Sequence, residues 1–401
     1  MSALDIKQIE TVVNEIVAVA KGEKANGGLP YGDFTTCATT ALQMDVNQIN
    51  NGISQVLSRT IFSVRPYTAL YKGLYKDSEK WGNHVRKMVA LDDEMEKDQR
   101  IYNADGSVLA NGDSVDMYSI KKTDVLQTNF YGFTQYQKKK TIWKDQLDTA
   151  FSSAQQFGNF LSMVMQSASD QLEQAREELA RGTLVNLVAG THKQGGNQVV
   201  HLLTEYNTAT GLILTKEDVL QPANYKPFMQ WTYARLQNLM DIMRTRSYLF
   251  HVNPTVNKVI KNIPRHTPYE RQHAYLLSDF INKSANMVES NTFNTEYLKK
   301  MDAEKVVYWQ DPTDVYMIKQ GTTYNYMDKT TGLITKGTIE EDLSSVVGVI
   351  FDDEAIGINL YNNWTGTTPF NVAGGYTNYF WHEGARYWVD NTENAIVICL
   401  D

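Results

Sequence analysis

The sequence predicts an α+β protein, and three observations carry this prediction. One long amphipathic helix stands between strand-forming regions, the second half of the chain mixes helix and strand patterns, and the chain closes on apolar, aromatic-rich strands. A length of 401 residues with 42% hydrophobic residues suits compact bodies with a sizeable core. Disorder is therefore not expected for the chain as a whole.

Charge and cysteine content exclude some classes of protein. A net charge of -8 argues against a dedicated nucleic-acid binder, which usually carries a basic excess. Cys37 and Cys399 are too few and too far apart for a zinc ligand set or a CxxC motif, so we expect reduced, buried thiols and an intracellular site of folding. We also expect neither a signal peptide nor a membrane span, because no basic leader and no apolar stretch of about 18 residues occurs.

The first element is an amphipathic helix followed by a glycine-rich loop. Its apolar stripe is Ile6, Ile9, Val13, Ile16 and Ala20, at steps of three or four residues. Such a helix has too little surface for a core of its own. We therefore expect it to pack on another part of the protein or on another copy.

Residues 100–143 have a different pattern, with turn signals followed by a long strand-forming run. Asp105-Gly106 and Asn111-Gly112 are strong turn signals. The run VLQTNFYGFTQYQKKKTIW then continues without proline, much longer than the usual strand of about five or six residues. We expect either a bent strand or a long hairpin arm that reaches outward.

The clearest element is a long helix from about Lys144 to Arg181, with Gly182 as its predicted stop. Its apolar stripe is Leu161, Val164, Ala168, Leu172, Ala175 and Leu179. Its length would be on the order of 55 Å. A coiled coil is the alternative, but the stripe contains two alanines and lasts few heptads.

The second half of the chain alternates between predicted strands and helices. YLFHV predicts a buried strand, Asn253-Pro254 a turn, and Thr255 the start of a helix. KVVYWQ and DVYMIKQ predict two short strands split by Asp311-Pro312. SSVVGVIFDDEAIGINLY predicts a strand, an acidic turn and a second strand. The closing pair of strands follows it. These final strands need a partner sheet that begins far upstream.

Two groups of residues are candidates for a catalytic or metal-binding site. His382 and Glu383 are neighbours on a predicted strand, so they point to opposite faces, and Gly384 predicts a turn or bulge beside them. His266, Glu270 and His273 could share one face of a helix and bind a metal, although HExxH is absent. The alternative for this group is an exposed polar helix beside a loop.

The charged runs have structural interpretations. The acidic stretches 92–98 and 390–394 lack the spacing of a calcium loop and predict solvated turns. Lys138–Lys140 and Lys144 form a basic run, for which a lysine-protected strand edge is the commoner explanation. No phosphate-binding glycine loop or nucleophile motif occurs. The sequence therefore predicts no catalytic residue, no metal site and no cofactor.

The order of these elements resembles the major capsid proteins of tailed bacteriophages, which have the Hong Kong 97-like capsid fold. The resemblance covers nearly the whole chain, and its most specific local matches are YLFHVNPTVNKVI, GVIFDDEAIGINL and RYWVDNTENAIVICL. It is nearest to the heads of small short-tailed phages of Gram-positive hosts. It implies an arm (1–60), an extended hairpin loop with its base strands (61–143), a peripheral domain with a "spine" helix (144–214), an α/β axial domain (215–345) and closing strands that return to the peripheral domain (346–401).

The resemblance also implies a function and partners. The protein would be a non-enzymatic subunit that self-assembles into pentamers and hexamers of an icosahedral shell around a double-stranded DNA genome. A separate scaffolding protein and a portal would assist, the DNA would lie inside without specific binding, and no membrane would be involved. Assembly would take place in the host cytoplasm. In some relatives a loop lysine is cross-linked to an asparagine, but no such pair can be identified among Lys138–Lys140, Asn391 and Asn394.

Two other functions compete with the shell subunit. The first is an intracellular metal-dependent hydrolase with ligands at His266, Glu270 and His273. It predicts stoichiometric metal in the purified protein. The second is an adhesion or tail component, which the long helix disfavours because tail tubes and fibres consist mostly of β-structure.

Overall fold

The computed structural model describes most of the chain from Tyr71 onward. The described residues are 71–76, 85–91, 97–103, 105–115, 118, 120, 124–146, 154–256, 259–260, 263–282, 304–328, 331 and 333–401. The chain forms two compact units, the first from 1–82, 132–183 and 357–387, the second from 83–131, 184–356 and 388–401. The predicted N-terminal helix and Cys37 lie outside the described residues, and the division into arm, loop, peripheral and axial domains stays a prediction.

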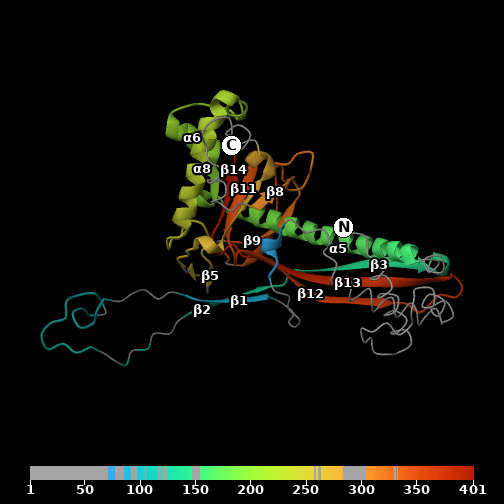
Figure 1. Ribbon diagram of the computed structural model, residues 1–401. Helices are drawn as coiled ribbons and strands as arrows, with labels where there is room; N and C mark the ends of the chain where they lie inside the picture. The colour runs from blue at the N-terminus through green and yellow to red at the C-terminus, as the bar shows by residue number, and fades with distance from the viewer. Residues whose placement is uncertain are drawn as a thin grey trace. The chain divides into compact units, whose positions relative to one another are not determined.

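The predicted long helix is α5 (Ala154–Gln194), 41 residues in length (Figure 1). At the usual helical rise it is about 60 Å long. The prediction that it stops at Gly182 is wrong, because Gly182 lies exposed within the helix. The apolar stripe continues beyond it, with Leu184, Leu187 and Val188 fully buried, and this burial outweighs the low helix propensity of one glycine. The helix ends before Gly195, which has a positive φ of 61°.

The first unit contains a three-stranded sheet in the order β12-β13-β3. Its strands are β12 (Ile356–Thr367), β13 (Tyr376–Val389) and β3 (Phe133–Trp143). β13 and β3 are antiparallel, from the pair Tyr376–Trp143 to the pair Arg386–Phe133. The prediction that a closing strand pairs with a region far upstream is therefore confirmed. The 3-10 helix η1 (Lys72–Leu74) also belongs to this unit.

The second unit is built around a five-stranded sheet in the order β4-β14-β11-β7-β8. Its strands are β4 (Val199–His201), β14 (Ala395–Cys399), β11 (Val346–Asp352), β7 (Gln272–Leu277) and β8 (Glu304–Val306). Every residue of β11 and β14 is buried, which explains their continuous apolar sequences. Cys399 is a free, buried thiol, and burial raises its pKa to about 12.

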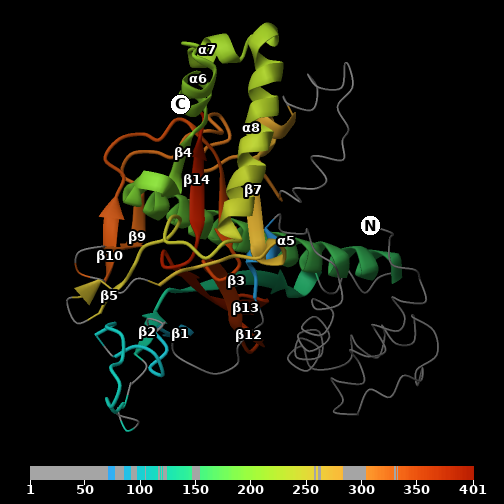
Figure 2. The ribbon, with the colours of Figure 1, turned by 90° about the vertical axis from the view of Figure 1, so that its left-hand side faces the viewer.

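Three helices follow β4 in the second unit: α6 (Leu202–Thr210), α7 (Lys216–Val219) and α8 (Pro222–Met243). Figure 2 shows α8 running alongside the sheet, and Gln272 of β7 donates a hydrogen bond from Nε2 to the carbonyl of Met240. Apolar side chains of α8, such as Phe228, Leu236 and Met243, are fully buried. The helix thus covers apolar sheet surface that would otherwise meet water.

A two-stranded ribbon, β1 (Val85–Ala90) and β2 (Val125–Phe130), also belongs to the second unit. The strands are antiparallel, from the pair Val85–Phe130 to the pair Ala90–Val125. The predicted turns between them are confirmed, because Gly106 and Gly112 have φ values of 82° and 103°. The segment that joins the two strands is here called loop 91–124.

The strand-forming run 125–143 is a broken strand. β2 and β3 are separated by Tyr131 and Gly132 and belong to different sheets. A Cβ atom on Gly132 would lie 2.4 Å from the backbone oxygen of Tyr387, so only glycine fits where the chain changes sheets. The run is therefore neither one bent strand nor a hairpin arm along its whole length: β2 pairs with β1 in an antiparallel ribbon, whereas β3 pairs with β13.

The predictions for 248–260 are wrong. YLFHV forms no strand, although Phe250 and Val252 are buried, and no helix begins at Thr255. Instead β5 (Thr255–Val256) and β6 (Val259–Ile260) form a short antiparallel pair. All four residues of the two strands are β-branched, and such residues favour extended backbone over helix.

Other short elements complete the second unit. β9 (Thr323–Met327) and β10 (Ile334–Thr338) form an antiparallel pair, and η2 (Gly196–Gln198) and η3 (Tyr269–Arg271) are 3-10 helices. KVVYWQ contains part of β8, as predicted, whereas DVYMIKQ forms no strand and contributes two isolated bridges, Asp314 to Asp311 and Ile318 to Leu343. The strand–acidic turn–strand prediction for 344–361 is confirmed by β11 and β12.

Candidate functional site

The predicted metal ligands do not share a helical face. His266 lies in an exposed loop, Glu270 in η3 and His273 in β7. Pro268 lies between the first two and is followed by a 3-10 turn rather than an α-helix, which breaks the assumed spacing. His273 Nε2 lies 2.9 Å from Asp353 Oδ1 instead. Across the described part of the chain, no group of three or more His, Cys, Asp or Glu side chains could hold a metal ion.

His382 and Glu383 point to opposite faces of β13, as the sequence predicts. The His382 ring stacks on Trp364, with 3.9 Å between ring centroids, whereas Glu383 is buried. The predicted turn or bulge at Gly384 is wrong, because Gly384 pairs regularly with Gln135. A Cβ atom there would lie 2.8 Å from the ring of Tyr361, so the glycine makes room for an aromatic ring.

Buried Glu383 is the acceptor of an arginine cluster in the first unit. Arg176 of α5 donates from Nε and Nη2 to the two Glu383 oxygens, at 2.6 and 2.5 Å, and from Nη1 to Glu173 at 2.5 Å. The Tyr75 hydroxyl donates to the backbone oxygen of Arg176 at 2.7 Å, and burial raises the pKa of Tyr75. Burial opposes the charge of Arg176, but its bonds to Glu383 outweigh this, so its pKa is raised. The cluster fastens the long helix to β13.

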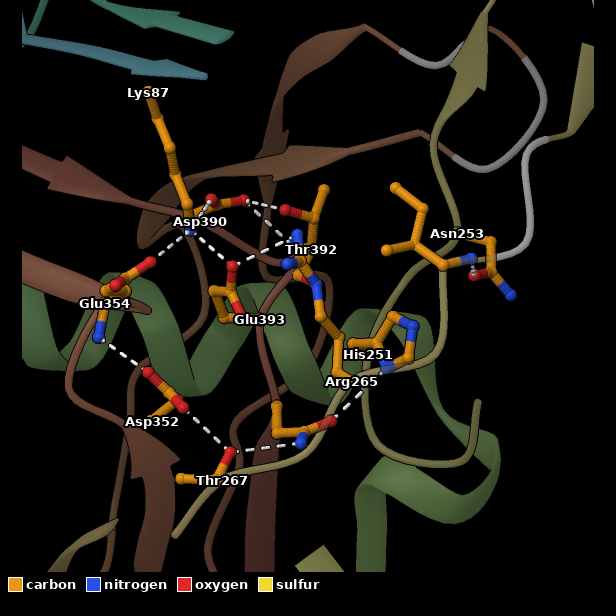
Figure 3. A network of polar contacts seen from close by, with 12 residues as sticks. Lys87, His251, Asn253, Arg265, Thr267, Asp352, Glu354, Asp390, Thr392 and Glu393 are labelled. Carbon is orange, nitrogen blue, oxygen red and sulfur yellow. Dashed lines mark hydrogen bonds and ion pairs between the residues drawn. The ribbon is translucent and has the colours of Figure 1, made fainter. Parts of the chain in front are cut away.

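The second unit contains a larger cluster at the turn 390–394. Lys87 of β1 points from the ribbon towards this turn (Figure 3). Its Nζ lies 2.8 Å from Asp390 Oδ2, 2.5 Å from Glu393 Oε1 and 3.4 Å from Glu354 Oε2. Arg265 adds a second cation, 3.1 Å from Glu393 Oε1. The prediction that 390–394 is a solvated turn is therefore wrong, because all five residues are buried.

Hydrogen bonds extend this cluster into the five-stranded sheet. The Thr392 N–H and hydroxyl both donate to Asp390 Oδ1, at 2.9 and 2.7 Å. Thr267 donates to Asp352 Oδ2 at 2.8 Å and accepts from Asn394 Nδ2 at 3.1 Å. His251 Nδ1 lies 3.2 Å from Asn394 Oδ1, and burial lowers the pKa of His251. The turn is thus held by polar contacts from several elements.

The two turn carboxyls have opposite pKa shifts. For Asp390, burial is outweighed by the Lys87 charge and by the Thr392 hydrogen bonds, so its pKa is lowered. For Glu393, burial dominates over Lys87 and Arg265, so its pKa is raised. The pKa of Lys87 is raised, because Asp390 and Glu393 outweigh the effect of burial. Asp390 is therefore the principal counter-ion of Lys87.

The predicted lysine-protected strand edge stays a prediction, although its lysines lie on an edge strand. Lys138–Lys140 lie on β3, which is an edge strand of its sheet. Lys138 donates to Gln171 of α5, and Lys139 lies over the ring of Phe380, 5.9 Å from its centroid. Two lysines of the run are thus held by contacts with α5 and β13.

Exposed apolar side chains gather along the ribbon and loop 91–124. Aliphatic residues of this kind are Met88, Ile101, Val108, Ile120 and Val125, with exposed fractions of 62%, 53%, 70%, 94% and 53%, and the aromatic Tyr118 is 79% exposed. Single exposed apolar residues are ordinary, but a succession of them along one extended segment is typical of a surface that contacts protein.

Comparison with known families identifies the class of protein. The family described as "Phi29-like phage major capsid protein" matches residues 35–399. The chain belongs to this family. Its members are structural proteins of the phage capsid, so the polar clusters and the exposed loop are parts of a shell subunit. None of the curated proteins matches the chain.

Solved phage structures resemble this capsid subunit. One, described as "Structure of head fiber and inner core protein gp22 of native bacteriophage P68", has a TM-score of 0.53 and 12% identity, covering 82% of this chain and 84% of that chain. The "Capsid structure of Staphylococcus phage Andhra" has a TM-score of 0.52 and 11% identity, covering 84% and 86%. The likeness confirms the predicted α+β capsid fold.

The capsid subunit is a virion protein that associates with copies of itself. Within the residues that the structure describes, no helix is long and apolar enough to cross a membrane. The Lys87 cluster was missed by sequence reasoning because its partners are about 300 positions apart in the chain. One signal was present: in VRKMV a lysine stands at the strand position between two valines, where alternation predicts an inward side chain.

Proposed function

We propose that this capsid protein is a non-enzymatic subunit that closes into pentamers and hexamers of an icosahedral shell around double-stranded DNA, with loop 91–124 lying on a neighbouring copy. The observation that carries the proposal is the exposed apolar surface of that loop and its ribbon. Its apolar side chains gain stability when another chain covers them. A second copy is the most abundant partner in a shell, and repeated contacts around a ring reinforce one another.

The other proposed partners follow from the same role. A net charge of -8 supports DNA packaged without specific binding, since strong phosphate contacts would oppose its movement into the shell. A separate scaffolding protein and a portal would guide closure, and assembly would take place in the host cytoplasm. We also expect the purified subunit to contain no stoichiometric metal, and the His266→Ala variant to assemble like the unmodified protein.

Electron microscopy and sedimentation velocity of the expressed protein, with and without phage scaffolding protein, test the proposal. We expect round shells or discrete pentamers and hexamers. Val108→Asp should reduce assembly at least tenfold, because it places a charge on an apolar contact. Asn111→Asp is the matched control, since it adds the same charge at an exposed polar position of the same loop. Equal assembly of the two variants would contradict a contact made by the loop.

A further inference from the structure

The ribbon of β1 and β2 has one inward face, and a lysine lies at its centre. Residues alternate along β1 between half-buried and exposed. The inward residues of the ribbon are Val85, Lys87 and Val89 of β1, paired with Phe130, Thr128 and Leu126 of β2. An alternating strand fixes which side chains face the protein. A charged group therefore occupies the position where an apolar residue would be expected.

The turn 390–394 is complementary to this lysine. The exposed fractions of the Lys87, Asp390 and Glu393 side chains are 15%, 1% and 7%. A shift of β1 by two residues, or by one residue that brings in Met88, would place an apolar side chain against the carboxylates and leave Asp390 buried without a cation, which is strongly unfavourable. A shift by one residue that brings in Arg86 would keep a cation there but would turn the inward residues Val85 and Val89 to solvent. The cluster thus accepts one register of β1.

Apolar burial alone is a weak anchor for the ribbon. An isolated two-stranded ribbon is marginally stable in water, and of its inward apolar residues only Phe130, at one end, is buried, whereas Val85, Val89 and Leu126 are half-buried. Buried ion pairs contribute less to net stability than to the choice of one arrangement, and register is their best attested role. The contact of Lys87 with Asp390 therefore selects the register of the ribbon, which the apolar contacts alone would leave weakly specified.

We propose that Lys87 is a clasp that sets the register of β1 against the turn 390–394, and so fixes the position from which loop 91–124 extends before copies of the subunit meet. The clasp itself lies within one chain. Its use in assembly rests on the proposed function, because that function makes the loop a contact with a neighbouring copy. The residue thus acts on assembly from a buried position.

Hydrogen exchange of the unassembled full-length subunit, followed by mass spectrometry, tests the clasp. Lys87→Met keeps the side-chain length and removes the charge. It should accelerate exchange at least tenfold in 85–91, 125–130 and 390–395, because the released ribbon is marginal on its own. Exchange in β7 and β11 should not change. Arg86→Met is the matched control: it removes a cation from the exposed face of the same strand and should have no effect.

Two further variants keep the test decisive. Lys87→Arg retains the cation and should restore slow exchange to within about threefold of the unmodified protein. Asp390→Asn removes the principal counter-ion and should repeat the Lys87→Met pattern, which covers the case that Lys87→Met does not fold. Unchanged exchange in the ribbon, or an equal rise throughout the five-stranded sheet, would overturn the clasp.

Assembly assays separate the clasp from the proposed loop contact. Val108→Asp should block assembly without altering exchange in the ribbon. If Val108→Asp assembles normally while Lys87→Met loosens the ribbon, the clasp stands and the loop contact fails. If ribbon exchange is insensitive to Lys87→Met while Val108→Asp blocks assembly, the contact stands and the clasp fails.

Discussion

Two charge clusters, one in each unit, hold their elements in different ways. Arg176 grips Glu383 with two guanidinium nitrogens and touches Glu173 with a third, a planar fork that fixes angle as well as distance. Lys87 presents one ammonium to three carboxylates, a point charge that fixes position but little else. The helix–strand contact is therefore rigid in orientation, whereas the ribbon is held at a point. Substitutions at the two clusters test that difference.

Arg176→Met should lower the free energy of unfolding by about 3–5 kcal/mol, because Glu383 would remain buried without a partner. Urea denaturation of the unassembled subunit measures the change. Arg100→Met, at an exposed pair with Asp98, is the control and should leave the midpoint unchanged. A decrease in the free energy of unfolding no larger than that of the control would mean that the Arg176–Glu383 contact does not stabilise the fold.

Asp390→Asn should lower the free energy of unfolding by about 2 kcal/mol near neutral pH, the size of a hydrogen bond to a charged group. The Asp390 pKa is lowered in the folded state, so this carboxyl stabilises the protein above its unfolded pKa of 3.8 and loses that effect as the pH falls through the folded value. The difference between variant and unmodified protein should therefore shrink in acid. A constant difference across pH would contradict this assignment.

Arg176→Lys should lower the free energy of unfolding by about 1–2 kcal/mol, because one ammonium cannot reproduce bonds to both Glu383 oxygens. Lys87→Arg should lower the free energy of unfolding by less, since the carboxylates around Lys87 require a positive charge but no particular orientation of it. Parallel urea titrations compare the two exchanges. If both cost the same, the contrast between fork and point charge is wrong.

Glu393→Gln should change the free energy of unfolding by less than about 1 kcal/mol near neutral pH. Its folded-state pKa is raised above 4.5, so its contribution is complete below 4.5 and is lost as the pH rises through the folded value. Replacing the ionised carboxylate by a neutral amide therefore removes a partly unfavourable charge. A loss as large as that of Asp390→Asn would reverse the ranking of the two carboxyls.

Periodicity predicted the elements whose burial is one-sided or complete. The stripe of α5, the apolar runs of β11 and β14 and the turns at Gly106 and Gly112 each carry a local signal. The fold class and the capsid family followed from the order of such elements. Local signals failed where tertiary burial decided, as at Gly182, where apolar residues continue the helix beyond a glycine.

The charge clusters could not be predicted because their partners are distant in sequence. DNTEN has the composition of a solvated turn, and only the approach of Lys87 and Arg265 makes its burial tolerable. Gly384 looked like a bulge because nothing local reveals the Tyr361 ring packed against it. Whether such a residue is buried or exposed therefore depends on partners that local sequence does not reveal.

The place of β14 in its sheet has a consequence for synthesis of the protein. It is the last strand of the five in chain order, yet it lies between β4 and β11. During translation those neighbours emerge first and must wait, with open edges, until 395–399 leave the ribosome. A nascent or truncated chain that lacks this strand therefore leaves the facing edges of β4 and β11 unpaired.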